Sequence, residues 1–381
     1  MTFVVEAVCG LARAGNLTTR HGEIRTPVFM PVGTHANVKA CIPAEIRDAG
    51  AQVLLCNSYH LALRPGVDLI RKAGGLHSFM GWNGAILTDS GGYQLVSLAG
   101  ISRINDDGAE FVSPYDGSRL FITPADAISN QANLGADIIM VLDQPTGYGG
   151  ADSTVQKAAD ARTIKWAKAC REAHPGNGHL VFGIAQGGFD RGGRQSSAAA
   201  IADLDFDGVA IGGLALGEPV DLMMDLAKTT AAALPDYLPR YFMGLGTTAE
   251  LLRMVAIGID MFDCVVPTRL ARHGVAMTAG GNLSLRQARY REDLAPIEEG
   301  CECPGCQIRF SRAYLRHLHV ARELLADRIL SVHNVTHLIH VMQLARNAII
   351  EGELDRFIGK ALAGITAGID TKEAHSSPLS W

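Results

Sequence analysis

Residues 136–142 read ADIIMVL, a helical pattern follows over residues 153–173, and a second apolar run, LVFGI, occupies residues 180–184. Both runs are too short for helices and do not alternate between apolar and polar residues, which is typical of strands buried on both faces. A strand, a helix and another strand in this order predict a parallel pair joined by a right-handed crossover. The stretch therefore predicts an α/β fold.

The same unit recurs before and after this stretch. Besides a second helical pattern at 219–234, there are further apolar runs at 52–56, 85–88, 208–211, 240–243 and 261–266. Seven or eight such units in fewer than about 300 residues predict a (β/α)8 barrel. An open, doubly wound sheet is the alternative, because periodicity does not show whether a sheet closes.

The composition is that of a globular protein. The 381 residues are 48% hydrophobic and 19% charged, which excludes a disordered chain, and the net charge of -5 argues against a broad positive coat for nucleic acid. No apolar run reaches the ~18 residues of a membrane span, and the N-terminus lacks the basic leader of a secretory signal. Five of the eight cysteines are scattered singly and three fall within six residues, which is the spacing of a metal site and not of a disulfide framework. We therefore expect a protein of the reducing cytoplasm, with no membrane association.

Polar residues and glycines follow the apolar runs. The segments are TDSGGYQ at 88–94, DQP at 143–145, QGG at 186–188 and GGLALGE at 212–218, with Asp263 in the last run. Barrel enzymes keep their chemistry at the C-terminal ends of the strands. Any one segment is explained by a turn or a helix cap, but the whole set predicts an active site.

Three aspartates in these segments are candidates for acid–base or nucleophilic chemistry, because each follows an apolar strand that partly desolvates it. Asp89 could instead cap a helix. Asp263 has no such role, because an apolar CVV segment continues the strand after it. The GLGTTA segment at 244–249 matches a dinucleotide-binding fingerprint, but no second mononucleotide half is visible, so we reject a nicotinamide cofactor.

The three clustered cysteines, Cys301, Cys303 and Cys306, lie within reach of one ion. A tetrahedral zinc needs a fourth ligand, and the downstream candidates are His317, His319, His333, His337 and His340. Three cysteines and a histidine leave no position for a reactive water. We therefore predict a structural zinc ion rather than a catalytic one.

Several motifs together resemble the bacterial tRNA-guanine transglycosylases. They are LTDSGGYQ at 87–94, FGIAQGG at 182–188, AIGGLALGE at 210–218, MFDCVVPTR at 261–269, the cysteine cluster and SRAYL at 311–315. The resemblance extends from about residue 27 to beyond residue 363. It implies a (β/α)8 barrel over 1–274, an inserted zinc-binding subdomain over 275–345, and a C-terminal helix that closes the barrel, with a polar tail, over 346–381.

The resemblance also implies an activity. Enzymes of this family exchange guanine at the wobble position (34) of tRNAs with a G-U-N anticodon for a 7-deazaguanine base. In bacteria the incoming base is 7-aminomethyl-7-deazaguanine, a queuosine precursor. The reaction is a double displacement through a covalent glycosyl-enzyme intermediate.

Residue roles follow from the match to the family's motifs. Asp263 would be the nucleophile and Asp89 the general base. The substrate-binding residues would be Ser90, Tyr93, Asp143, Gln186, Gly213, Leu214, Glu218 and Met243, with Tyr93 and Met243 sandwiching the base ring. The zinc ligands would be Cys301, Cys303, Cys306 and His333. The tRNA backbone would meet Arg269, Arg272, Arg286 and Arg289, and a homodimer would use Phe310 and Tyr314.

The chain departs from the family at a few positions. Gln144 and Pro145 stand where glutamate and cysteine are usual, Leu216 replaces a valine, and the interval from Cys306 to His333 is one residue longer. A non-catalytic tRNA-binding subunit, or an exchanger acting on another base or nucleic acid, is the alternative. The first should lack the aspartate pair, which this chain keeps.

Overall fold

A closed barrel forms the centre of the computed structural model, which describes residues 2–97, 103–149 and 152–368. Its eight parallel strands are, in ring order, β4 (Val28–Gly33), β5 (Val53–Asn57), β6 (Ala85–Asp89), β10 (Ile138–Met140), β11 (Leu180–Ala185), β12 (Gly208–Ile211), β13 (Arg240–Phe242) and β14 (Met261–Cys264). The ring closes where β14 pairs with β4, with Phe262 opposite Phe29. The barrel prediction is confirmed, and the open sheet is excluded.

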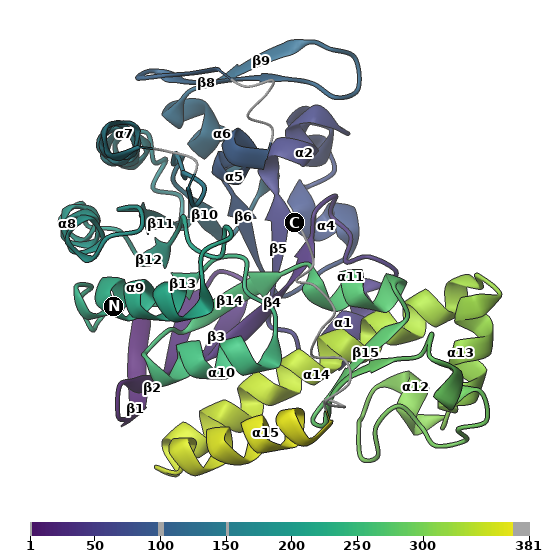
Figure 1. Ribbon diagram of the computed structural model, residues 1–381. Helices are drawn as coiled ribbons and strands as arrows, with labels where there is room; N and C mark the ends of the chain where they lie inside the picture. The colour runs from purple at the N-terminus through teal and green to yellow at the C-terminus, as the bar shows by residue number, and fades with distance from the viewer. Residues whose placement is uncertain (1, 98–102, 150–151, 369–381) are drawn as a thin grey trace.

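Helices surround the barrel (Figure 1). The two helical patterns of the sequence correspond to α7 (Ser153–Glu172) and α9 (Val220–Ala232). The Asp152 carboxylate caps α7 by accepting hydrogen bonds from the backbone N–H groups of Thr154 and Val155. The remaining barrel helices are α1 (Pro43–Asp48), α2 (Ser58–Leu63), α3 (Val67–Lys72), α4 (Gly75–Met80), α5 (Gly92–Ser97), α6 (Pro124–Leu134), α8 (Arg191–Ala202), α10 (Thr248–Ala256) and α11 (Val266–Arg272).

Two antiparallel sheets interrupt the repeating pattern that the sequence suggested. One precedes the barrel and consists of β1 (Phe3–Cys9), β2 (Ala12–Thr19) and β3 (Gly22–Thr26). The other lies between α5 and α6 and consists of β7 (Arg103–Asn105), β8 (Gly108–Val112) and β9 (Arg119–Ile122). The first barrel strand, β4, was also not among the apolar runs, because its sequence VFMPVG contains proline and glycine, which are poor strand formers.

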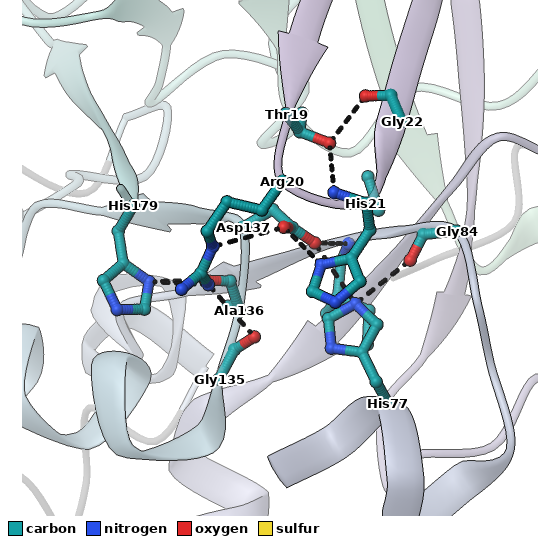
Figure 2. Close-up of polar contacts among 12 residues, drawn as sticks. Thr19, Arg20, His21, Gly22, His77, Gly84, Gly135, Ala136, Asp137 and His179 are labelled. Carbon is teal, nitrogen blue, oxygen red and sulfur yellow. Dashed lines mark hydrogen bonds and ion pairs between the residues drawn. The ribbon is translucent and has the colours of Figure 1, made fainter. Parts of the chain in front are cut away.

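The turn between β2 and β3 is fastened to the N-terminal end of the barrel (Figure 2). Asp137, buried just before β10, accepts hydrogen bonds from His21 Nδ1 at 2.6 Å and from the Ile86 backbone N–H at 2.9 Å, and His77 Nε2 lies 3.2 Å away. Burial alone would raise the pKa of Asp137, but these hydrogen bonds outweigh it and hold the pKa below its usual value. The N-terminal sheet thus covers the end of the barrel opposite to the strand C-termini.

The C-terminal region contains β15 (Val275–Thr278), β16 (Gly281–Ser284), the 3-10 helix η1 (Ala288–Tyr290), α12 (Pro304–Gln307), α13 (Arg312–Val320), α14 (Leu324–Ile350) and α15 (Leu354–Gly368). The helical pattern of the sequence predicts a single helix from about 335 to 363, and this prediction is wrong. Helix α14 begins earlier, and Gly352, with a φ of +73°, separates it from α15.

Helix α14 links the C-terminal region to the barrel. It packs on α12 and α13 and also on β4 and the N-terminal sheet, as its diagonal course in Figure 1 illustrates. The expected border of the zinc-binding subdomain at residue 345 falls within this helix. The division into domains stays a prediction. The expected polar tail at 371–381 lies outside the described residues. Within the described part of the chain, none of the helices combines the length and the apolar character needed to cross a bilayer.

Candidate active site and metal centre

The C-terminal ends of the barrel strands bring the predicted polar residues to one rim. Asp89 is the last residue of β6, Asp143 and Gln186 follow β10 and β11, and Asp263 lies in β14. Since all eight strands are parallel, these ends meet at the same mouth of the barrel. The polar residues at these strand ends therefore belong to one candidate site.

The Asp89 carboxylate is held by the end of the neighbouring strand. Its Oδ1 accepts a hydrogen bond from the Ser58 backbone N–H at 2.9 Å, and its Oδ2 accepts one from the Asn57 side-chain amide. Burial, with the charges of Asp263 and Asp143, raises the pKa of Asp89 to about 7, although the Ser58 hydrogen bond opposes this shift. A carboxyl group that titrates near neutral pH can both take up and release a proton.

The Asp263 carboxylate has a different environment. Its Oδ1 accepts hydrogen bonds from the Tyr241 hydroxyl at 2.5 Å and from the Gly244 backbone N–H at 2.9 Å. Burial raises the pKa of Asp263, and both hydrogen bonds counteract the rise by stabilising the anion. The two aspartates are therefore distinguished by their partners, one by a strand-end amide and the other by a buried phenol.

Asp143 and Gln186 form a pair. The Gln186 side-chain amide donates to Asp143 Oδ2 at 2.6 Å, and the Gln186 backbone N–H donates to Ser197 Oγ at 2.9 Å. Burial raises the pKa of Asp143 to about 7, against the effect of the Gln186 hydrogen bond. Gly92 lies directly beneath, because a Cβ there would stand only 1.9 Å from Asp143 Oδ1. The carboxylate position thus requires glycine at residue 92.

The loop after β12 is fixed by its own carboxylate. Glu218 accepts hydrogen bonds from the backbone N–H groups of Ala215 at 2.6 Å and Leu216 at 2.9 Å. Gly213 has a φ of +70°, and a Cβ on it would lie 2.1 Å from Gln186 Oε1. Leu214, which lies between Gly213 and Ala215 in the chain, is buried. Glu218 therefore shapes the loop backbone.

The remaining predicted substrate residues lie on the same side of the barrel. Tyr93 on α5 is 57% exposed, and Met243 directly after β13 is partly buried. Ser90 is buried, and its hydroxyl accepts a hydrogen bond from the Gly92 backbone N–H at 3.4 Å, which is a turn contact. Gln144 points its carbonyl oxygen to Arg162 Nη1 at 2.6 Å. The sandwich of Tyr93 and Met243 stays a prediction.

The four arginines expected to meet tRNA are all exposed. Arg269 and Arg272 lie on α11, which begins just after Asp263, and Arg289 lies on η1 with Arg286 shortly before it. Helix α11 packs against β15, the strand that follows it in the chain (Figure 1). The α11 pair therefore puts positive charge close to the candidate site.

The cysteine cluster meets a histidine of α14. His333 Nδ1 lies 3.5, 3.4 and 3.6 Å from the sulfur atoms of Cys301, Cys303 and Cys306. Zinc–sulfur and zinc–nitrogen bonds of about 2.3 and 2.1 Å at a tetrahedral angle place sulfur and nitrogen about 3.6 Å apart. The four ligand atoms therefore fit one tetrahedral ion.

The second nitrogen of His333 supports the same arrangement. His333 Nε2 donates a hydrogen bond to the Met277 carbonyl oxygen at 2.8 Å, which leaves the lone pair of Nδ1 directed at the sulfur atoms. The other histidines have different surroundings, since His337 Nε2 lies 3.1 Å from Thr248 Oγ1 and His317 and His319 are on α13. The four residues form a candidate metal centre with no position left for a substrate.

Some residues of the site were missed by sequence reasoning. Asn57 directly follows the apolar run at 52–56, and that position was a usable signal. Tyr241 is a fully buried aromatic residue inside a strand, where nothing in the sequence separates it from the core. Its role becomes visible only because β13 and β14 are neighbours in the barrel.

Comparison with known proteins agrees with this geometry. The sequence model of a family described as "Queuine tRNA-ribosyltransferase" matches residues 9–366. Proteins of that name from Solidesulfovibrio magneticus and Nitratidesulfovibrio vulgaris are 49% and 48% identical to this chain, covering 92% and 93% of it and 94% and 95% of their own lengths. Another, from Caldanaerobacter subterraneus subsp. tengcongensis, is 50% identical over 91% of this chain and 92% of its own length. The chain therefore belongs to the queuine tRNA-ribosyltransferase family of enzymes.

Proposed function

We propose that this protein exchanges guanine at the wobble position of G-U-N anticodon tRNAs for 7-aminomethyl-7-deazaguanine, in queuosine biosynthesis. The observation that carries the proposal is the pair Asp89 and Asp263, two carboxylates with different hydrogen-bond partners at one barrel mouth. Membership of the family and the names of the relatives support the same activity. The aspartate pair also argues against a non-catalytic subunit.

The proposed mechanism is a double displacement on the ribose. Both hydrogen bonds described for Asp263 are accepted by Oδ1, so Oδ2 is the oxygen that attacks C1′. The bond from C1′ to the guanine nitrogen breaks as the glycosyl ester forms, and the leaving base takes a proton from Asp89. The incoming base then returns a proton to the Asp89 carboxylate and attacks C1′, which releases Asp263 and restores the original configuration. One glycosidic bond replaces another, so no energy source is required.

Base recognition would use the pair Asp143 and Gln186. The Asp143 carboxylate accepts hydrogen bonds from the ring and exocyclic N–H groups of a guanine-like base, and the Gln186 amide donates to its carbonyl. Their mutual contact at 2.6 Å keeps both side chains at the rim. Gly213 and the Leu214 carbonyl would complete the polar contacts, with Tyr93 and Met243 on the two ring faces.

The rest of the molecule would serve tRNA binding. The exposed residues Arg269, Arg272, Arg286 and Arg289 supply local positive charge for the phosphate backbone, which reconciles RNA binding with a net charge of -5. A structural zinc ion, when bound by the cysteine cluster, would stabilise the subdomain that carries part of this surface. We also propose a cytoplasmic homodimer with Phe310 and Tyr314, whose rings lie 5.1 Å apart, at the contact.

The test is exchange of radiolabelled guanine into unmodified bacterial tRNA with a G-U-N anticodon. We expect incorporation that depends on G34, with a matched transcript carrying another base at that position as the control. Exchange into DNA or at another tRNA position would support the alternative exchanger. Tight tRNA binding without any exchange would support the non-catalytic subunit.

Competition against labelled guanine checks which base enters. Leu216 is one methylene larger than the usual valine, and Pro145 removes a backbone N–H donor. We expect 7-aminomethyl-7-deazaguanine to compete well and the bulkier queuine to compete tens- to hundreds-fold less, because a steric clash of this kind costs about 1–3 kcal/mol. A Leu216→Val variant is the matched control. Equal inhibition by both bases would contradict the expectation.

Base affinity should depend on pH. Only the ionised form of Asp143 accepts two N–H donors, and its raised pKa of about 7 leaves it mostly protonated in acid. The KM for guanine should therefore fall roughly tenfold as the pH rises from about 6 to about 8, and then level off. The measurement is the guanine KM at saturating tRNA, with Asp143→Asn as the comparison that binds weakly at every pH. A wild-type KM that does not change across this range would contradict the assignment.

A further inference from the structure

A fully buried arginine joins two loops of the candidate base site. Arg194, on the first turn of α8, is 0% exposed. Its Nε donates to the Gly188 carbonyl oxygen at 2.6 Å, and its Nη1 donates to the Gly212 carbonyl oxygen at 2.7 Å. Gly188 follows Gln186 in the loop after β11, and Gly212 precedes Gly213 in the loop after β12. One rigid guanidinium group thus sets the spacing of both loops.

The third nitrogen of Arg194 makes the residue unusual as a purely structural element. Among the described residues, Nη2 has no hydrogen-bond partner, and it lies 3.6 Å from the position of a Cβ on Gly213. Asp160 and Glu218 are the carboxylates whose charges stabilise the guanidinium. A buried charge with an unused donor costs stability compared with an apolar side chain. A functional reason therefore accounts better for its presence.

Asp160 on α7 holds the same loop from the other side. Its Oδ1 accepts hydrogen bonds from the Gly187 backbone N–H at 3.0 Å and from the Gln156 side-chain amide at 2.9 Å. The loop lies directly on α8, since a Cβ on Gly187 would stand 2.4 Å from the Gly193 carbonyl oxygen. Arg194 and Asp160 therefore fix the backbone on both sides of Gly187.

We propose that Arg194 is a positioning residue for base recognition, which sets the distance between the Gln186 amide and the Gly213 peptide through its hydrogen bonds to Gly188 and Gly212. The inference rests on the proposed function, because it assumes that these two groups read the base. Without the guanidinium group the two loops can move independently of each other. The base then loses contacts, whereas the surface that binds tRNA is unchanged. The expected effect is therefore a loss of base affinity with unchanged tRNA affinity.

The test compares Arg194→Lys with Arg191→Gln on the same helix. Arg191 forms an exposed ion pair with Asp225 on α9. For Arg194→Lys we expect the guanine KM to rise roughly ten- to a hundredfold, because lysine cannot reproduce the two-pronged contact. The tRNA KM should stay within about twofold of wild type. The Tm should fall, because a buried carbonyl oxygen that loses its donor costs stability. Arg191→Gln should match wild type in all three.

A second readout is discrimination between bases. Inhibition by 2-aminopurine, which lacks both the carbonyl group that Gln186 would read and the ring N–H from which Asp143 would accept a hydrogen bond, should be far weaker than inhibition by guanine for wild type. The difference should shrink in Arg194→Lys, whereas general loss of stability would weaken both bases equally. An unchanged guanine KM and unchanged discrimination would overturn the inference, and so would a parallel change in the tRNA KM.

Failure of the proposed function has a separate signature. If wild type itself exchanges no guanine, the proposed function is wrong. If wild type is active and Arg194→Lys has the wild-type guanine KM and base discrimination, only the inference about Arg194 is refuted. Should Arg194→Lys not fold, Asp160→Ala takes its place, because it releases the same loop from the other side. The same rise in guanine KM alone is expected, and an unchanged guanine KM in that variant overturns the inference.

Discussion

Asp263→Asn should abolish base exchange and leave the fold and tRNA binding intact. An amide cannot form the glycosyl ester, so we expect the rate of guanine incorporation to fall by about 10⁴-fold or more. The asparagine carbonyl oxygen can still accept the hydrogen bonds from Tyr241 and Gly244, and the buried charge disappears, so the Tm should not decrease. Exchange rate, tRNA affinity and thermal unfolding are measured on the same preparation.

Trapping of the intermediate identifies the nucleophile directly. Wild type mixed with tRNA and analysed on a denaturing gel should give a covalent protein–tRNA band, and Asp263→Asn should give none. Asp225→Asn is the matched control, because Asp225 is in an ion pair with Arg191 on the surface. A band that persists in Asp263→Asn would assign the nucleophile to another residue.

Cys303→Ser should remove the metal and destabilise the C-terminal region. Elemental analysis of wild type should give one zinc ion per chain, and the variant should have none or nearly none. Zinc contributes roughly 10 kcal/mol to small zinc-dependent folds, and α12 and the start of α14 are held together around these ligands. We therefore expect a separate unfolding step at lower temperature and faster proteolysis near α12 and α13.

Two comparisons sharpen the metal prediction. Cys9→Ser changes a cysteine outside the cluster and should keep both the zinc and the Tm. His333→Ala should lose the zinc, because the wild-type His333 Nδ1 lies close to all three sulfur atoms and would be the fourth ligand. Full zinc retention in His333→Ala would point to His317, His319 or His337 as the fourth ligand.

Much of the barrel could be predicted because its strands are buried on both faces and read as apolar runs. The N-terminal sheet could not, because β2 reads ARAGNLTT, and its buried residues Ala12, Ala14 and Gly15 are too small to form a recognisable apolar run. Strand β4 was missed for a local reason, the proline and glycine in VFMPVG. Helix α14 was placed too late because its buried residues surround it on all sides and give no clear periodicity.

The candidate site divides in the same way. Asp89, Asp143 and Asp263 could be picked out because a carboxylate at a strand end is visible in the sequence alone. Asn57, Tyr241 and Arg194 could not be assigned, since their contacts depend on which strands and loops are neighbours. Arg194 in particular lies in the segment RGGR, which reads as the exposed start of a helix, whereas the structure buries it completely.

The pairing of β14 with β4 has a consequence for the order in which the protein folds during synthesis. One edge of β4 pairs early with β5, but its other edge finds its partner only in residues 261–264, so most of the chain must leave the ribosome before the ring can close. Until then β4 exposes an unpaired edge, and its outer face waits still longer for α14, which ends at Ile350. Contacts this distant in sequence make folding slow and the nascent chain prone to aggregation. The early sheet of β1, β2 and β3 is formed from neighbouring residues and can fold at once.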